Sequence, residues 1–114
     1  SAEDLLQAQR RRRQLIAAVE AALQDIDVLL TASSMEAPCR IDDTAEIART
    51  YGRQARTPFN VTGHPAIALR SGLSAGGLPL ALQIAGRFHD EATICRVAAA
   101  IELTLLFPGI DEDR

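Results

Sequence analysis

Residues 57–86 read TPFNVTGHPAIALRSGLSAGGLPLALQIAG, and this stretch decides the fold. A segment dense in turn residues, 57–65, precedes two short apolar runs, 66–70 and 80–86. Three glycines and a proline lie in residues 72–79 between the runs, a composition typical of a flexible connection. The pattern therefore predicts an antiparallel hairpin. Because both runs are apolar on both faces, we expect the hairpin in the middle of a layered structure.

A long helix is predicted before this hairpin. Residues 2–24 contain neither glycine nor proline, and apolar side chains recur at helical spacing. These apolar positions are Leu15, Ile16, Val19, Leu23 and Ile26. We expect them to form the buried side of one amphipathic helix.

Three further segments connect this helix to the hairpin. Residues 27–32 are short and apolar, as in a buried strand. Residues 33–43 contain Pro38 and several polar residues, and we expect a surface loop there. Residues 44–54 return to helical spacing, with Thr44 as the expected N-cap and Gly52 as the expected end.

A last helix is predicted to begin after Asp90, whose side chain can cap free backbone amides, with Glu91 complementing the helix dipole. We expect Pro108-Gly109 to end it and residues 111–114 to form a charged tail. The expected buried stripe consists of Ile94, Val97, Ala98, Ile101 and Leu105.

The composition of the chain limits the classes of function that it can have. The 114 residues suffice for one domain, and 47% apolar with 24% charged residues is a globular mixture. The net charge of −3 gives no general attraction to nucleic acid, and no segment is apolar for long enough to span a membrane. All twelve basic residues are arginine, which excludes chemistry that needs a lysine amine. We expect a cytoplasmic chain of bacterial type, with neither a cofactor nor a metal ion.

Several residues could be mistaken for catalysts. Ser33-Ser34 has no flanking glycine and no lysine base, so we interpret it as structural. His64 lies in a constrained turn and His89 precedes a helix, and both are interpreted as packing or capping residues. Gly76-Gly77 leads into a strand, whereas a phosphate-binding loop leads into a helix. Neither Cys39 nor Cys95 belongs to a CxxC pair, so we expect reduced, partly buried thiols.

Three ordered motifs resemble the amidase signature family. Residues 57–66, TPFNVTGHPA, are similar to its R-P-F-N-x-T-G-x-P-A segment, and residues 77–87 are similar to its G-L-P-x-G-L-Q-x-x-G segment. Residues 90–93, DEAT, resemble the start of its final helix, and 27–31, DVLLT, resemble an upstream strand. The motif residues are Pro58, Phe59, Asn60, Gly63, Pro65, Gly77, Pro79, Gln83, Gly86, Asp90 and Glu91. From the turn itself, we expect Asn60 to bond backbone groups and hold it rigid.

The resemblance implies the C-terminal part of a layered α/β/α fold with a mixed central sheet flanked by helices, here as a single domain or fragment over 1–114. It implies hydrolysis of a carboxamide by the whole enzyme. The family's two serines and its lysine lie N-terminal to this region, so no catalytic residue is carried over and the substrate-binding residues are not assigned. The implied partners are the remainder of the chain and a small-molecule amide.

Departures from the family pattern also matter. Ala32 and Ala81 stand where the family usually has proline and often glycine. Arg53, or a neighbour, stands where the glutaminase subunits of tRNA-dependent amidotransferases carry an acid that holds the substrate's amino group. This difference favours a general amidase over that branch.

Three hypotheses stay open from the sequence. The first is an amidase fragment that is inactive alone, and the second is a binding module that keeps the fold without the chemistry. The third is nucleic-acid binding by Arg10–Arg13, which the acidic net charge disfavours; four successive helical residues also sweep about 300° and cannot form one face. Unpaired strand edges make homodimerisation a further expectation.

Overall fold

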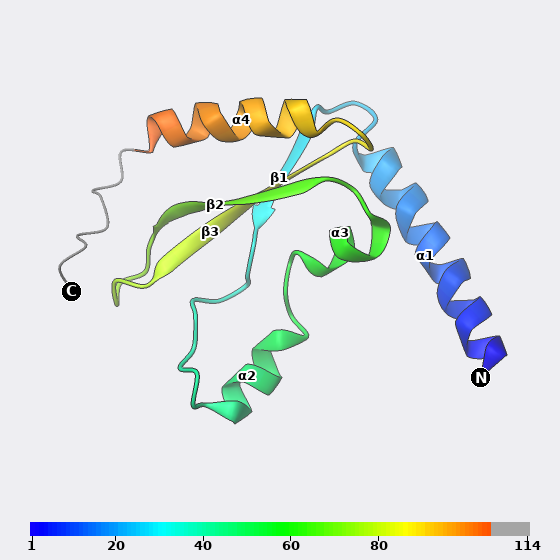
Figure 1. Cartoon of the computed structure of the whole chain (residues 1–114), viewed down its shortest axis with the longest axis horizontal. Helices are drawn as coiled ribbons and strands as arrows, with labels where there is room; N and C mark the ends of the chain where they lie inside the picture. The colour runs from blue at the N-terminus through cyan, green and yellow to red at the C-terminus, as the bar shows by residue number, and fades with distance from the viewer. Residues whose placement is uncertain (106–114) are drawn as a thin grey trace.

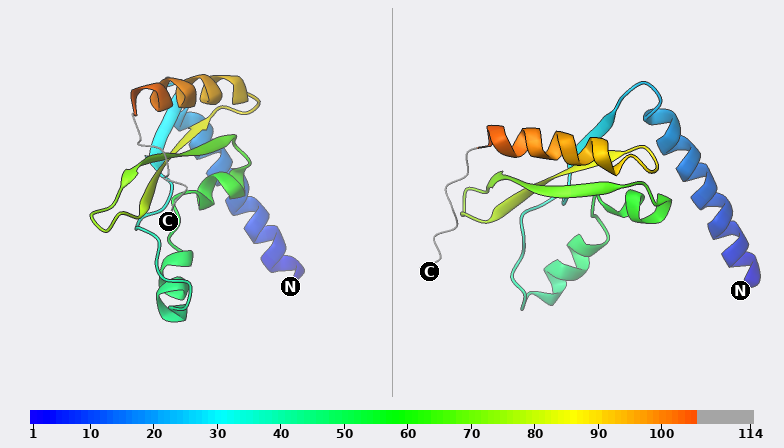
Figure 2. Two further views of the ribbon diagram at one scale, coloured as in Figure 1. Left: turned by 60° about the vertical axis from the view of Figure 1, so that its left-hand side comes forward. Right: turned by 45° about the horizontal axis from the view of Figure 1, so that its top comes forward.

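The computed structural model describes residues 1–105, in which helices lie on both sides of a three-stranded sheet (Figure 1). The elements are α1 (Ala2–Ala22), β1 (Val28–Ala32), α2 (Thr44–Tyr51), α3 (Thr57–Thr62), β2 (Ala66–Leu73), β3 (Pro79–Gly86) and α4 (Glu91–Thr104). In both views of Figure 2, α4 follows one side of the sheet while α2 and α3 lie on the other. The predicted layered α/β arrangement is confirmed.

The predicted hairpin is formed by β2 and β3, which pair antiparallel from Ala66↔Ala85 to Leu73↔Pro79. Both strands are longer than expected, and the connection is correspondingly tighter. The Ser74 amide donates to the Leu78 carbonyl over 2.8 Å, and Gly77 adopts φ +79°, which glycine tolerates without strain. Pro79 is the first residue of its strand, where a missing amide hydrogen does little harm.

The central strand of the sheet is β3. On its other side it pairs antiparallel with β1, from Val28↔Gly86 to Ala32↔Leu82, so the order is β1-β3-β2. Burial increases along β3: Pro79 to Ala81 are exposed, whereas Gln83 to Gly86 are buried. The end of β3 that carries the Gln-Ile-Ala-Gly sequence is therefore the one that organises the core.

The core lies between the sheet and α4. Leu69, Ile84, Ile94 and Ala98 are buried together, and Val28, Ile67, Val97 and Ile101 pack around them. Four residues of the predicted stripe, Ile94, Val97, Ala98 and Ile101, are thus confirmed, whereas Leu105 is the C-cap of α4 and lies outside this cluster. Asp90 is the predicted N-cap: its Oδ1 accepts from the Thr93 hydroxyl over 2.7 Å and from the Thr93 amide over 3.4 Å. The predicted stop at Pro108-Gly109 and the charged tail lie outside the described residues.

The segment 57–62 is helical, which corrects the expectation of an irregular turn. Pro58 stands in the first turn, where its fixed φ suits a helix and its missing amide hydrogen has no partner to lose. Gly63 ends α3 with φ +82°, the left-handed conformation common after a helix. The local rules for a short helix were present in the sequence, but the density of turn residues concealed them.

The helix α2 begins one residue earlier than predicted. Asp43, rather than Thr44, is its N-cap, because the Asp43 carboxylate accepts from the Glu46 amide over 3.0 Å. A carboxylate also interacts favourably with the positive end of the helix dipole. Gly52 follows the last turn as predicted.

The helix α1 is confirmed but packs only through its second half. Leu23, its C-cap, is buried, whereas Leu5 and Leu6 are exposed and Ile26 lies beyond the helix, 40% exposed. Arg12 fastens α1 to α3, since its Nε donates to the Val61 carbonyl over 2.7 Å. Within residues 1–105, no helix combines the length and the hydrophobicity needed to cross a membrane.

We predict that Gly86→Ala destabilises the fold. A Cβ at this position would lie 2.6 Å from Cγ2 of Ile94, a side chain that is only 3% exposed. Overpacking of this kind costs about 1–3 kcal/mol of unfolding free energy, measurable by urea denaturation.

Gly72→Ala is the matched control, because nothing lies within 4 Å of its added Cβ. Its effect should stay within about 0.5 kcal/mol. The cost of Gly86→Ala should also shrink in an Ile94→Ala background, which lacks the obstructing methyl. Equal urea midpoints for Gly86→Ala and Gly72→Ala would show that the close approach does not matter.

Candidate functional site

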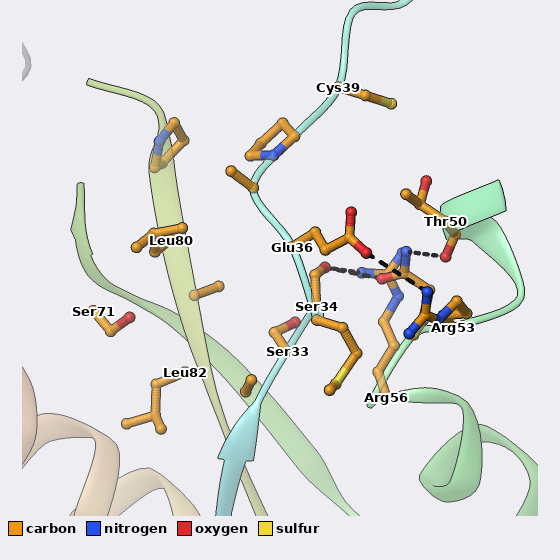
Figure 3. Close-up of a pocket in the computed structure, with 17 residues that line it drawn as sticks. Ser33, Ser34, Glu36, Cys39, Thr50, Arg53, Arg56, Ser71, Leu80 and Leu82 are labelled. Atoms are coloured by element: carbon orange, nitrogen blue, oxygen red, sulfur yellow. Dashed lines mark hydrogen bonds and ion pairs between the residues drawn. The ribbon is translucent and has the colours of Figure 1, made fainter. Parts of the chain in front are cut away.

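A hollow of about 810 Å³ lies beside the end of β1 (Figure 3). We call it the Ser34 pocket. One wall is polar and comes from the loop after β1, the last turn of α2 and the α2–α3 connection: Ser33, Ser34, Glu36, Thr50, Arg53, Gln54 and Arg56. Ser71, Leu80 and Leu82, from β2 and β3, lie across the hollow in Figure 3. The pocket thus joins three segments that are far apart in the sequence.

The hydroxyl of Ser34 is occupied by structural hydrogen bonds. It donates to Oε1 of Gln54 over 2.9 Å and accepts a longer bond of 3.4 Å from Nη1 of Arg56. Gln54 is held in turn by the Thr50 carbonyl, to which its Nε2 donates over 3.1 Å. An amide oxygen is too weak a base to remove the serine proton, so this contact does not activate Ser34 as a nucleophile.

Among the charged side chains that line the Ser34 pocket, arginines outnumber glutamates. Arg49 donates to both Glu36 and Glu46, and these hydrogen bonds hold the pKa of each carboxyl below its usual value. Arg53 reaches Glu36 only at 3.9 Å. Within residues 1–105, Arg56 forms no ion pair with a carboxylate. The pocket therefore carries more positive than negative charge.

His64 lies at a second hollow, of about 470 Å³, which shares no lining residue with the Ser34 pocket. Its ring stacks on Phe88 at a centroid distance of 4.0 Å, and Nδ1 lies 2.8 Å from the Thr62 hydroxyl. Its Nε2 is buried without a hydrogen-bond partner in the described part of the chain. Burial lowers the pKa of His64, an effect that Glu20 partly opposes. His64 is therefore a packed, neutral imidazole rather than the base for Ser34.

The other tempting residues also occupy structural places. His89 directly precedes the cap residue Asp90 and adopts φ 62°. Cys39 and Cys95 are free thiols, and both are exposed, which corrects the expected partial burial. Cys39 lies in the loop after β1, and Cys95 falls outside the buried stripe of α4. Among residues 1–105, no three His, Cys, Asp or Glu side chains cluster closely enough to hold a metal ion.

The motif residues are distributed through the fold and do not converge on one centre. Phe59 is buried on α3, whereas Asn60 is exposed, and among residues 1–105 its side chain forms no hydrogen bond to the turn. The expectation for Asn60 is thus wrong for the described residues, because α3 directs it outward. Gln83 has the strongest positioning role: its Nε2 donates to the Thr31 hydroxyl over 3.0 Å and to the Ala55 carbonyl over 3.5 Å.

Sequence reasoning did not identify Arg56, Gln54 and Glu36 as neighbours of Ser34. The signal in the sequence was the place of Arg53, or a neighbour, in the family pattern, where the amidotransferase subunits carry an acid. Ser34 and Glu36 come close to Gln54 and Arg53 only in the folded chain, because about twenty residues separate the two segments in the sequence.

A sequence model of the family described as Amidase matches residues 1–95 of this chain. The chain belongs to the amidase family. The resemblance based on the three motifs is thereby confirmed over most of the length. This amidase chain is also similar to solved amidase-family structures, one of which is a glutamyl-tRNA(Gln) amidotransferase subunit from Thermotoga maritima. That likeness has a TM-score of 0.79 at 28% identity and covers 86% of this chain and 22% of the other.

Two curated relatives show how the length of this chain compares with the length of related proteins. A glutamyl-tRNA(Gln) amidotransferase subunit of Granulibacter bethesdensis is 36% identical over 104 residues, covering 90% of this chain and 21% of the relative. An uncharacterized protein in the nthA 5' region of Rhodococcus erythropolis is 38% identical over 92 residues, covering 75% and 46%. The amidase chain thus spans about a fifth of the length of its amidotransferase relatives.

We predict that His64 makes stability fall with acidity. Because burial lowers its pKa in the folded chain, the unfolded chain binds the proton first as the pH falls below about 6.5. The stability tied to neutral His64 is complete above that pH and is lost as the pH falls towards the folded pKa. His64→Phe removes this titration and keeps an aromatic ring beside Phe88.

The melting temperature should therefore drop less for His64→Phe than for the parent chain between about pH 7.5 and pH 5.5. His89→Asn is the control, since Asn tolerates the left-handed φ of that position and His89 is exposed. If His64→Phe loses as much stability as the parent over this interval, the buried imidazole is not the cause.

Proposed function

We propose that this chain is the C-terminal part of an amidase that hydrolyses the C–N bond of a carboxamide, and that it is inactive alone. The observation that carries the proposal is the family match over residues 1–95 in a chain that spans about a fifth of its amidotransferase relatives. The geometry of the described residues agrees with this, because Ser34 faces an amide oxygen and His64 lies at another hollow.

The proposed contribution of the chain is structural support and one wall of the substrate pocket. Gln83 fixes the α2–α3 connection to the sheet, which sets the position of Ser34, Arg53 and Arg56. The nucleophile and the base would come from the remainder of the amidase, and the substrate would be a small-molecule amide. A cytoplasmic enzyme that works without a cofactor belongs to the same proposal, as does pairing of two copies through the edges of β1 and β2.

The choice between a general amidase and a component of a glutamyl-tRNA(Gln) amidotransferase turns on Arg53. An arginine in the polar wall of the Ser34 pocket would repel, rather than hold, the ammonium group of an amino acid. On this ground the general amidase is the proposed branch, even though several relatives are named as amidotransferase subunits.

A binding module without catalysis is the second candidate. The observation in its favour is that the matching segment makes up 46% of the Rhodococcus erythropolis relative, against 21% of the Granulibacter bethesdensis relative. This amidase segment thus also occurs in a much shorter protein, which leaves less room for the catalytic part.

We predict that the chain alone releases no ammonia from simple amides above the buffer rate, whereas the protein encoded by the whole gene does. A panel of acetamide, benzamide and glutamine, assayed for ammonia, tests both proteins side by side. Turnover by the chain alone that disappears in Ser33→Ala or Ser34→Ala would overturn the proposal. No turnover by the whole protein on any amide would favour the binding module.

A further inference from the structure

The Ser34 pocket has the composition of a site for a molecule with one anionic and one apolar end. Its polar wall carries Arg53 and Arg56, and apolar residues, among them Met35, Pro79 and Ala81, also line the hollow. The hollow, of about 810 Å³, can hold a small ligand together with water.

The positive charge of the polar wall is not neutralised within residues 1–105. Of the described residues, Glu36 is the only carboxylate that lines the pocket, and it already accepts both Nη1 and Nη2 of Arg49. Arg53 therefore shares an engaged carboxylate at 3.9 Å, and Arg56 has only the hydroxyl oxygen of Ser34 at 3.4 Å. Most of the five donors of the Arg56 guanidinium are thus available to a ligand.

The hydrogen bonds of Ser34 and Gln54 preorganise this wall. Because the Ser34 proton points to Gln54, its oxygen faces Arg56 as an acceptor and fixes one edge of the guanidinium. Gln54 is itself tied to the Thr50 carbonyl. A planar guanidinium held in this way binds a carboxylate through two parallel hydrogen bonds.

We propose that the Ser34 pocket binds a carboxylate on the substrate, remote from the amide that is cleaved, with Arg56 as its main ligand and Arg53 as the second. The substrate class is the monoamide of an aliphatic dicarboxylic acid, whose methylene groups would lie against Pro79 and Ala81, on the face of β3 that carries Gln83. This inference rests on the proposed amidase function and adds a substrate class to it.

The test uses the protein encoded by the whole gene and three amides of similar length. Adipamate carries a carboxylate, 6-oxoheptanamide carries a neutral methyl ketone in the same place, and 6-aminohexanamide carries an ammonium group. Ammonia release gives kcat/KM for each. Charge-assisted pairing predicts a preference for adipamate over the ketone of about tenfold to a hundredfold, expressed mainly in KM.

Variants of the two arginines test which residue causes the preference for adipamate. Arg56→Gln should lower kcat/KM for adipamate about tenfold or more beyond any change for the ketone, Arg53→Gln should reduce the preference in part, and Arg56→Glu should favour 6-aminohexanamide. Arg96→Gln on α4 is the control, since Arg96 is exposed and lines neither hollow. If Arg56→Gln fails to fold by circular dichroism, Arg53→Gln decides.

Two outcomes overturn the inference: equal kcat/KM for adipamate and the ketone, or arginine variants that lower both equally. The latter would show that acids elsewhere in the whole protein neutralise these arginines. Calorimetry of adipate and neutral adipamide separates this from failure of the amidase proposal. Adipate binding that is lost in Arg56→Gln, in a protein that cleaves no amide, would uphold the pocket and reject the activity. Equal binding of the two probes would reject the pocket.

Discussion

The structure depends on the double pairing of β3. Its Gln83–Gly86 end is hydrogen-bonded on one side to β1 and on the other to β2, and its Ile84 side chain is buried against α4. A strand with neighbours on both sides satisfies its backbone groups completely and tolerates burial on both faces. The absence of a side chain at Gly86 lets α4 approach closely through Ile94. Sheet, hairpin and last helix are thus specified by one short apolar sequence.

Two polar side chains, Gln83 on β3 and Arg87 just after it, connect the sheet to outlying segments of the chain. Gln83 bonds to Thr31 on β1 and to the Ala55 carbonyl in the α2–α3 connection, so the polar wall of the Ser34 pocket is positioned relative to the sheet. Arg87 donates to the carbonyls of Leu23 and Ile26, which fastens the turn after α1. A buried amide and an arginine that satisfy backbone carbonyls fix these two segments relative to the sheet.

Local rules predicted most of the elements. The hairpin, the Asp90 cap and the stripe of α4 follow from periodicity and capping chemistry, which act within a few residues. The two errors also have local causes. At the start of α2, either Asp43 or Thr44 could cap the helix, and α3 is too short for helical periodicity to be visible in the sequence. The three motifs identified the family without revealing a site, because their residues lie at separate points of the fold.

The Ser34 pocket could not be predicted, because its lining residues come together only in the tertiary structure. The bond from Ser34 to Gln54 spans twenty residues, and the opposite side of the pocket comes from strands further along the chain. The sequence pointed to Arg53 or a neighbour through the family pattern, but not to the closeness of Arg56 to Ser34. Whether Arg56 can bind a ligand depends on how many carboxylates lie near it in the folded chain, and this number cannot be read from the sequence.

The position of β1 in the sheet has a consequence for how the chain reaches its native state. The hairpin pairs residues that are close in sequence, so it can close at once, whereas Ala32 meets Leu82 across fifty residues. Closing such a loop has an entropic cost that a few strand contacts must offset, which slows the step. Attachment of β1 is therefore expected to be the late event of folding. Until then one edge of β3 is open to pairing with any extended strand, which makes that interval the time of greatest vulnerability to aggregation.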